Sequence, residues 1–431
     1  MATLITKLKN RVRFNGALAA LDLCLNARFT RLVPSILAAA ANRINQTGEF
    51  TVLCLGRSVF MDDVRALATY GQRLRYISIH RIYWKKIFSH FLSAADTQDL
   101  TEFNYHSRRF PDGGNEKYYH YLLQLLPRLQ RRLGFHAVLT GNIGYFEQQE
   151  IIRVCRELKI PFIVLHKEAM DVYGGYLNLY KNYRFDGDRI LFYNEKIKDA
   201  LLALNIPGVT ADKVHVVGIP RLDAYFQDLA NPPWDKTVLF FSFFPKDKFL
   251  NMITDQGQLQ WAIEAYGKFH RLVIEFAKSH PEYQVTIKTK SSTHYVNYVT
   301  DIVAQVGTQI PNLVVTNQGS PAELIKQSNS IIGFNSTALI EAVILGRKII
   351  SPNFNQLLSD TSWDFFADYP ELVTVVKTGQ ELETAIGNAV STAVPEEYRQ
   401  RFLQELIYTP DGRASGRTEA AIIETITEKP A

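Results

Sequence analysis

Short apolar runs alternate with longer segments of helical periodicity along most of this 431-residue chain. The runs are long enough for buried strands, and the segments between them are long enough for crossover helices. This alternation predicts an α/β protein built on parallel sheets with right-handed connections. The predicted strands are residues 50–55, 75–80, 136–140, 162–165, 189–193 and 214–217, followed by 237–241, 284–288, 313–316, 331–333 and 348–350.

Helices are expected between these strands and at the chain's N-terminal end. In the second half they fall near residues 257–279, 295–306, 321–328 and 337–345, and in the first half near 147–158 and 195–204. Residues 1–45 and most of 81–133 also show helical patterns, the latter interrupted at 110–114.

The length of the chain exceeds that of one ordinary domain and favours two. The segment Asn231-Pro232-Pro233-Trp234 is typical of a linker. We therefore expect a helical N-terminus over residues 1–45 and two Rossmann-like domains over 46–230 and 235–400, facing an interdomain cleft. A helical tail is expected over 401–431. Ligands of such domains bind at the carboxyl ends of the strands.

The net charge of +5 is concentrated at the N-terminus. Residues 1–44 contain seven basic residues and one acidic residue, Asp22, which gives this segment a charge of +6 and leaves −1 for the rest. A basic amphipathic helix of this kind can lie on an anionic membrane surface. The alternative is an ordinary packing helix with a solvated basic face. No module of basic and aromatic residues follows, so a nucleic-acid partner is not expected.

The remaining composition excludes several classes of protein. Cys24, Cys54 and Cys155 are far apart in apolar contexts, which predicts buried reduced thiols and a cytoplasmic protein. The ten histidines form neither HxxxH nor HExxH, so no metal site is expected. We expect no membrane span, because no apolar run is long enough. We also expect no secretory signal, because the apolar run at residues 16–25 contains Asp22 and lacks a convincing cleavage site. A location at the inner face of the cell membrane would depend on the basic N-terminus.

The turn at residues 333–337 is the first candidate site. It connects a buried strand to an apolar helix, and it contains Asn335, Ser336 and Thr337. Free N–H groups, the helix dipole and two hydroxyls together make a candidate phosphate cradle. Glu341 follows in the helix, where a carboxylate could hold a ribose hydroxyl. The alternative is that Ser336 only caps the helix.

A second polar cluster follows the strand at residues 162–165. His166, Lys167 and Glu168 supply an imidazole, an ammonium group and a carboxylate in successive positions. Such a group can act as a general base or as an electrostatic clamp. The alternative is the solvated start of a loop.

Two further strand ends carry groups suited to a phosphate ligand. Lys288, Lys290 and Ser291 follow one strand, and Ser242 follows the first strand of the second half. Solvated lysines are the alternative interpretation. The chain contains neither GxGxxG nor GxxxxGK[ST], which argues against a dinucleotide-dependent dehydrogenase and a P-loop NTPase.

Gly218 and Arg221 occupy another strand end, in the segment Gly218-Ile219-Pro220-Arg221-Leu222-Asp223. Glycine and proline fix the turn, and the charged residues enter the next helix. Arg221 is a candidate ligand contact, whereas Asp223 could serve only the helix dipole.

Taken in order, these clusters resemble those of the CDP-glycerol glycerophosphotransferases and of related bacterial glycosyltransferases that build surface polysaccharides. The resemblance covers about residues 136–417. It rests on the strand-end His166 and on VGIPRLDAYF at 217–226. It also rests on the lysine-rich strand end, on GFNSTALIEAVILGRKII at 333–350, and on DGRASGR at 411–417.

The resemblance implies a GT-B fold and a nucleotide-activated donor. It implies phosphate contacts from Lys288, Lys290, Ser336 and Thr337, and catalysis by His166 or Glu168 without a metal. Two departures favour transfer of a sugar over glycerol phosphate. Lys288-Thr289-Lys290 stands where the family has His-Pro, and the turn at 333–337 lacks the family's acid.

We therefore expect a glycosyltransferase that carries sugar from a nucleotide sugar, such as a CMP-activated acidic sugar, to a saccharide or lipid-linked saccharide of a capsule or other surface polymer. The nucleotide sugar is the substrate, and no cofactor is expected. The alternatives are glycerol- or ribitol-phosphate transfer and a non-catalytic GT-B scaffold. A nucleotide-sugar 2-epimerase shares the fold, but its acidic and histidine pattern is not evident. If neither His166 nor Glu168 acts as a base, a mechanism that retains the anomeric configuration is favoured.

Overall fold

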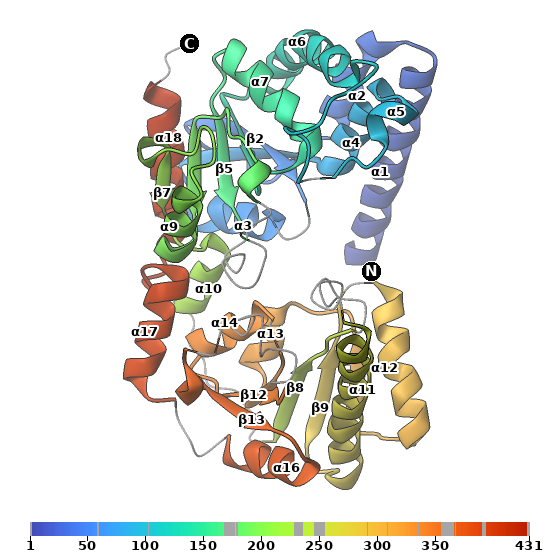
Figure 1. Cartoon of the computed structure of the whole chain (residues 1–431), viewed down its shortest axis with the longest axis vertical. Coiled ribbons are helices and arrows are strands. Elements are labelled where there is room, and N and C mark those ends of the chain that lie inside the picture. The colour runs from blue at the N-terminus through green and yellow to red at the C-terminus, as the bar shows by residue number, and fades with distance from the viewer. Residues whose placement is uncertain are drawn as a thin grey trace. The chain divides into compact units, whose positions relative to one another are not determined.

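The computed structural model describes most of the chain and divides it into two compact units. The described residues are 2–57, 60–101, 103–167, 177, 180–227, 236–244, 255–290, 292–307, 309–334, 336–354, 366, 368–389 and 394–428, with the side chains of 2–11 left aside. One unit comprises Met1–Val172, Tyr176–Ala224 and Leu406–Ala431, and the other comprises Tyr173–Gly175 and Tyr225–Glu405 (Figure 1).

This division differs from the expected domains at the C-terminus. The tail predicted over 401–431 is not separate, because its last helix belongs to the first unit. The first unit is therefore completed by residues from the far end of the chain. The boundary between the units falls after Ala224, a few residues before the predicted linker, which lies outside the described residues.

The first unit contains a seven-stranded sheet in the order β1-β3-β2-β4-β5-β6-β7. All neighbours are parallel except the short edge strand β1, which runs antiparallel to β3 and was not predicted. The strands are β1 Asn42–Arg43, β2 Phe50–Gly56, β3 Leu74–His80, β4 Ala137–Thr140, β5 Phe162–His166, β6 Arg189–Phe192 and β7 Val214–Val216.

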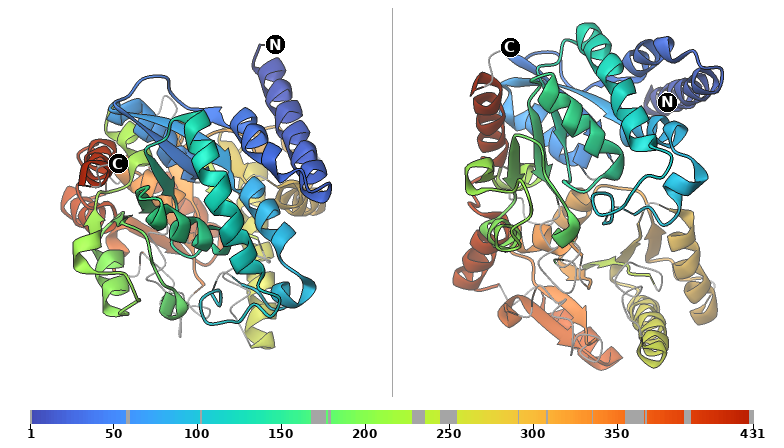
Figure 2. Two further views of the ribbon diagram at one scale, coloured as in Figure 1. Left: turned by 90° about the horizontal axis from the view of Figure 1, so that it is seen from above. Right: turned by 45° about the horizontal axis from the view of Figure 1, so that its top comes forward.

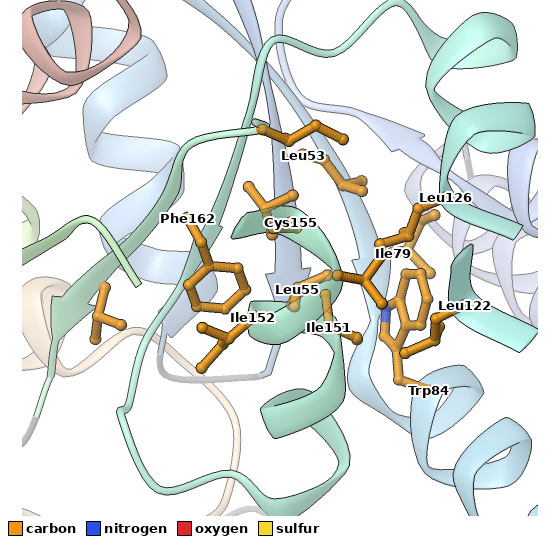
Figure 3. Close-up of a cluster of buried hydrophobic side chains, with 14 of the residues drawn as sticks. Leu53, Leu55, Ile79, Trp84, Leu122, Leu126, Ile151, Ile152, Cys155 and Phe162 are labelled. Carbon is orange, nitrogen blue, oxygen red and sulfur yellow. The ribbon is translucent and has the colours of Figure 1, made fainter. Parts of the chain in front are cut away.

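Helices cover both faces of this sheet, as a parallel sheet requires. They are α1 Ala2–Asn26, α2 Val33–Ala40, α3 Phe60–Ala66, α4 Arg81–Phe91, α5 Ala94–Thr97, α6 Gly114–Leu133, α7 Gln149–Glu157, α9 Glu195–Ala203 and α18 Ala414–Glu428, with α10 Asp223–Gln227 at the unit boundary. Figure 3 shows part of the core on one face, where Leu53 and Ile79 of the sheet face Trp84, Leu122 and Ile151 of the helices.

The second unit contains a six-stranded, wholly parallel sheet in the order β10-β9-β8-β11-β12-β13. Its strands are β8 Thr237–Phe241, β9 Gln284–Lys288, β10 Leu313–Thr316, β11 Ser330–Ile332, β12 Ile349–Pro352 and β13 Val373–Val376. Its helices are α11 Gln256–Ser279, α12 Thr293–Val306, α13 Pro321–Lys326, α14 Ala338–Ile344, α16 Gly379–Asn388 and α17 Glu396–Ile407, the last of which continues into the first unit. Both units confirm the predicted parallel α/β class, and β13 is an additional strand.

Apolar side chains of the two central strands form the core of the second unit. Phe240 and Ile332 are fully buried against Phe269 and Val273 of α11. The strands are mostly apolar along their length, so polar side chains occur mainly where the strands end. This arrangement is what places candidate site residues at one edge of the sheet.

The three cysteines lie where the sequence predicted. Cys24, Cys54 and Cys155 are buried free thiols. None of the described helices combines the length and the apolar character needed to cross a bilayer.

The C-terminal helix α18 is attached to the first unit by a buried carboxylate. Glu419 has no exposed surface and accepts hydrogen bonds from the backbone N–H groups of Arg73 (2.8 Å) and Leu74 (3.0 Å) and from the Tyr76 hydroxyl (3.0 Å). A side chain at Gly71 would collide with this carboxylate, because a Cβ there would lie 2.3 Å from Cδ of Glu419. The carboxylate is therefore the specific contact that joins α18 to the start of β3.

Replacing Glu419 with alanine should destabilise the protein by at least about 3 kcal/mol, because each buried donor left without an acceptor costs about 1–3 kcal/mol. The matched control is Glu424→Ala on the same helix, whose side chain is 53% exposed. That change should stay within about 0.5 kcal/mol of the original. Urea unfolding of both variants measures the difference, and equal stabilities would contradict the anchoring role.

Candidate functional site

The order of strands in the second sheet reverses between β8 and β11. From β8 the chain passes to β9 and β10 on one side, and it then returns to place β11 on the other side of β8. In a parallel sheet such a reversal leaves a crevice at the carboxyl ends of the two strands, where ligands bind. Ser242 directly follows β8, and the turn containing Ser336 and Thr337 follows β11. The predicted donor-binding residues therefore flank this crevice.

Ser242 is bonded to a buried histidine that was not predicted as a site residue. His270 on α11 has no exposed surface, and its Nδ1 lies 2.7 Å from the carbonyl oxygen of Tyr266. Its Nε2 lies 2.8 Å from Oγ of Ser242. Burial lowers the pKa of His270 to about 4, so the ring is neutral.

These contacts fix which way the Ser242 hydroxyl points. A carbonyl oxygen can only accept, so Nδ1 of His270 must carry the single ring proton and Nε2 must be an acceptor. The Ser242 hydroxyl therefore donates its proton to Nε2. Its lone pairs remain for a ligand, which makes Ser242 an acceptor for a ligand hydroxyl or N–H group, not the phosphate donor suggested by its position in the sequence.

The turn after β11 presents hydroxyls at the start of α14. Oγ of Ser336 lies 3.4 Å from the N–H of Ala338, and the exposed Thr337 makes no capping hydrogen bond. The helix has only seven residues, so its dipole contributes less than the sequence suggested. Glu341, expected to hold a ribose, accepts a hydrogen bond from the Tyr225 hydroxyl.

The two lysines after β9 have different surroundings. Nζ of Lys288 donates to the carbonyl oxygens of Thr289 (2.8 Å) and Asn317 (3.2 Å), and burial lowers its pKa. It thus joins β9 to the end of β10. Lys290 is exposed, with its ammonium group 5.7 Å from the centre of the Tyr295 ring. Lys290 is therefore the better placed of the two to meet a phosphate.

A cavity of about 510 Å³ lies at the ends of β12 and β13 in the same unit. It is close to the turn after β11, because the ring of Phe354 in its wall lies 4.8 Å from that of Phe334. Its lining includes the aromatic residues Trp261, Phe269 and Phe354 and the lysines Lys268 and Lys377. The rest is mainly aliphatic. Such a lining suits an anionic ligand with a flat ring.

The first sheet also reverses its strand order, between β2 and β4. Arg57 follows β2, and its Nη1 lies 3.3 Å from the hydroxyl of Tyr145. Arg81 follows β3 and forms a buried ion pair with Glu147, while its guanidinium lies 3.7 Å from the centre of the Tyr145 ring. The exposed Arg57 is thus supported by a fully enclosed charge pair.

His166 ends β5 as predicted, but it is enclosed. The imidazole has no exposed surface, Tyr180 and Phe192 pack on it, and Nδ1 has no hydrogen-bond partner among the described residues. Burial, with a smaller effect from Lys167, lowers its pKa to about 3. As placed, His166 is a buried and weak base, which does not favour the expected general-base role.

Gly218 and Arg221 serve the packing of the first unit. Gly218 has φ +87°, and a Cβ there would lie 3.1 Å from the carbonyl oxygen of Ile407. The guanidinium of Arg221 pairs with the buried carboxylate of Asp63 at 3.1 Å and with the Tyr193 hydroxyl at 2.9 Å. These contacts are internal to the first unit, unlike those of the other predicted donor-binding residues, which belong to the second.

The described structure thus brings some predicted residues together and leaves others aside. Ser242, Ser336, Thr337 and Lys290 converge on one edge of the second sheet. Glu168, Ser291 and Asn335 lie outside the described residues. No trio of His, Cys, Asp and Glu side chains in the described part of the chain is arranged to hold a metal ion.

His270, Asp63 and Glu147 are the residues that sequence reasoning missed. Each lies within or next to a predicted or observed helix, and its role depends on a partner far away in the chain. The one available signal in the sequence was a polar residue within an apolar helix pattern. This signal does not identify the distant residue with which that polar residue pairs.

Comparison with known proteins agrees with this architecture. No protein-family model and no curated protein matches the chain. A protein from Listeria monocytogenes assigned as a UDP-N-acetylglucosamine 2-epimerase superposes with a TM-score of 0.51 at 11% identity, over 89% of this chain and 99% of its own. The UDP-GlcNAc 2-epimerase of Neisseria meningitidis, bound to UDP-GlcNAc, gives a TM-score of 0.49 at 16% identity, over 88% and 99%. The chain therefore has the GT-B fold, as expected.

The burial of His270 predicts a specific dependence of stability on pH. The unfolded chain takes up a proton at this imidazole below its ordinary pKa of 6.5, whereas the folded protein stays neutral down to about 4. In that window the unfolded state binds more protons, so falling pH favours unfolding. By about pH 5 the loss should be about 2 kcal/mol for this one group.

The variant His270→Gln keeps an acceptor for Ser242 but has no group that titrates. Its stability should fall less steeply than that of the original protein between about pH 7 and pH 5, by about 2 kcal/mol. Urea unfolding at a series of pH values measures both slopes, and all other titrating groups cancel in the comparison. Parallel profiles would show that His270 is not held neutral.

Proposed function

We propose that this protein is a GT-B transferase that binds a nucleotide sugar at the carboxyl edge of its second sheet. The observation that carries the proposal is the reversal of strand order between β8 and β11, flanked by Ser242, Ser336 and Thr337. A strand-order reversal with hydroxyl groups after both strands fits a ligand that combines phosphate with hydroxyls.

The chemistry of the flanking groups matches the parts of a nucleotide sugar. The hydroxyls of Ser336 and Thr337 can donate to a diphosphate, and the exposed Lys290 ammonium can neutralise its charge. Ser242 offers lone pairs, because its proton is held by His270, and so suits a sugar or ribose hydroxyl. The aromatic and basic cavity beside Phe334 is a suitable place for the base.

The comparison with solved structures supports the class of ligand. The superposed Listeria protein is assigned as an enzyme of UDP-N-acetylglucosamine, and it shares the architecture over nearly its whole length. We propose that this chain also uses a nucleotide sugar. Transfer of the sugar to a cell-surface saccharide is the finer proposal, and it rests on the motifs at residues 136–417.

The proposed transfer does not use His166 as a base, because its imidazole is buried and its lowered pKa makes it a weak base. We propose a route in which the phosphate of the leaving nucleotide is stabilised by Lys290, Ser336 and Thr337. Glu168, the other expected base, lies outside the described residues. If the protein supplies no base, a retaining mechanism fits this arrangement. The anomeric configuration of the product tests this point directly.

A second candidate function is epimerisation of the nucleotide sugar, favoured by the assigned activity of the Listeria protein. The two reactions differ in their need for an acceptor. An epimerase converts the nucleotide sugar alone, whereas a transferase releases nucleotide diphosphate or monophosphate only with an acceptor. Transfer of glycerol or ribitol phosphate would leave phosphate in the polymer, which phosphorus analysis of the product detects.

A thermal-shift screen should identify the donor. We expect CMP, CDP, UDP or one of their sugars to stabilise the protein, by about 2.7 kcal/mol at one hundred times its dissociation constant. AMP serves as a control for unspecific nucleotide binding. If none of these ligands stabilises the protein, the scaffold alternative becomes the better explanation.

Removing the hydroxyls after β11 should weaken nucleotide binding selectively. In the double variant Ser336→Ala/Thr337→Ala we expect affinity for the nucleotide found in the screen to fall at least about tenfold, the equivalent of about 1.4 kcal/mol. Stability should change by less than about 1 kcal/mol, because neither hydroxyl makes a strong capping bond. Calorimetric titration measures the affinity.

The matched control is Thr384→Ala on α16, an exposed threonine of the same unit whose hydroxyl bonds only within its own helix. It should leave affinity unchanged. Equal affinities for the double variant and the control would exclude the turn as part of the donor site.

A further inference from the structure

The N-terminal segment holds most of the strongly exposed apolar side chains of the described residues. Val12 and Leu23 on α1 are 65% and 69% exposed, and Phe29 and Leu32 in the turn before α2 are 62% and 53% exposed. Exposed apolar side chains that gather in one short segment often mark a surface that contacts another molecule.

The outer face of α1 is apolar over three turns. Val12, Gly16, Ala19 and Leu23 are all exposed and lie three or four residues apart, so they share one face of the helix. The other side, including the buried Leu21, packs on α2 and α4. Figure 2 shows α1 at the periphery of the first unit. Val12, Gly16, Ala19 and Leu23 thus form a face without a charged side chain in the described part of α1, whereas the side chains of Lys7, Lys9 and Arg11 lie outside the described residues.

Positive charge stands directly beside the exposed apolar side chains at the end of α1. Arg28 immediately precedes Phe29, and Arg31 immediately precedes Leu32. Both arginines are exposed, and neither forms an ion pair among the described residues. The one acid of this segment, Asp22, is bound to Nζ of Lys86 at 2.6 Å. No carboxylate of the segment therefore neutralises the two guanidinium groups.

We propose that this N-terminal surface, formed by Val12, Leu23, Phe29 and Leu32 with Arg28 and Arg31, binds an anionic lipid bilayer. The apolar side chains enter the boundary between headgroups and acyl chains, and the guanidinium groups bind the lipid phosphates. The surface goes beyond the proposed sugar transfer, because it determines where the enzyme works and brings it to lipid-linked acceptors.

The distribution of charge favours a bilayer over a second copy of the chain. In a symmetric dimer the same surface faces itself, so Arg28 and Arg31 of both copies would approach each other. Residues 1–44 carry a net charge of +6, and such an approach is repulsive. An anionic bilayer supplies both the apolar phase and the opposite charge.

Sedimentation with vesicles tests the proposal on the full-length protein. The protein should bind vesicles of equal parts phosphatidylglycerol and phosphatidylcholine and should not bind pure phosphatidylcholine. The double variant Phe29→Ser/Leu32→Ser should lower partitioning at least about tenfold. The variant Arg28→Gln/Arg31→Gln should lower it about thirtyfold at low salt, since each base near an anionic surface contributes about fivefold. Added salt should weaken binding of the original protein.

Two matched controls are available in the same chain. Val314→Ser/Val375→Ser removes the other two strongly exposed apolar side chains, and Arg131→Gln/Arg132→Gln removes two exposed bases from α6. Both variants should bind vesicles as the original protein does. Far-ultraviolet circular dichroism confirms folding, which these exposed positions should not disturb.

Absence of binding to the anionic vesicles would overturn the proposal, and so would unchanged binding by Phe29→Ser/Leu32→Ser. Light scattering that shows a dimer broken by the same variant, without vesicle binding, would assign the surface to a second copy of the chain. The assay contains no nucleotide, so its result is independent of the proposed transferase activity.

Discussion

The reversal of strand order in the second sheet is the constraint on which the candidate site depends. A helix that connects two parallel strands covers one face of the sheet and leaves the carboxyl ends of those strands to the loops. Strand order shows that successive connections go to opposite sides at β8 and β11. In parallel sheets the loops after two such strands generally diverge and leave a crevice between them. The crevice is thus a property of the topology. The sequence needs only to place suitable polar groups, such as Ser242 and Ser336, directly after the strands.

Buried imidazoles then determine what these polar groups can do. His270 uses both ring nitrogens, one as donor to Tyr266 and one as acceptor from Ser242, and it fixes the direction of that hydroxyl. His166 in the first unit is equally buried, but its Nδ1 has no partner among the described residues. An unpaired buried polar atom costs about 1–3 kcal/mol, a cost that His270 avoids because both of its ring nitrogens are paired. The two histidines thus differ in hydrogen bonding and not in burial.

Features with a local cause could be predicted from the sequence, and features that arise from distant partners could not. Apolar runs bounded by polar residues located the strands, and their alternation with helices determined the fold class. Strand β13 was missed because its sequence, VTVV at 373–376, is short and carries no distinct boundary, and β1 has only two residues.

The candidate site shows the same difference between features with a local cause and features that arise from distant partners. The position of a residue shortly after a strand predicted that Ser336 and Lys290 lie at the carboxyl edge of the sheet, because that depends only on strand direction. It did not predict that Lys288 turns back to the carbonyl of Asn317, or that Arg221 is held by Asp63. Both outcomes depend on residues far away in the sequence. The local pattern predicted His166 correctly as a strand end, but not that it would be enclosed.

Residues 225–405 of the second unit form one segment inserted into the first unit, and contacts lie near the crossing points at its start and its end. The carboxylate of Asp223, just before the chain leaves the first unit, accepts hydrogen bonds from the N–H groups of Ala414 (3.0 Å) and Ser415 (2.7 Å), just after it returns. Arg417 adds a bond from Nε to the carbonyl of Val217 at 3.0 Å. Because both crossings are fixed side by side within the first unit, the inserted residues form a closed loop that can hold a sheet of its own. The first unit, in contrast, lacks α18 until the whole chain is present. Its completion therefore depends on a contact between residues nearly two hundred positions apart.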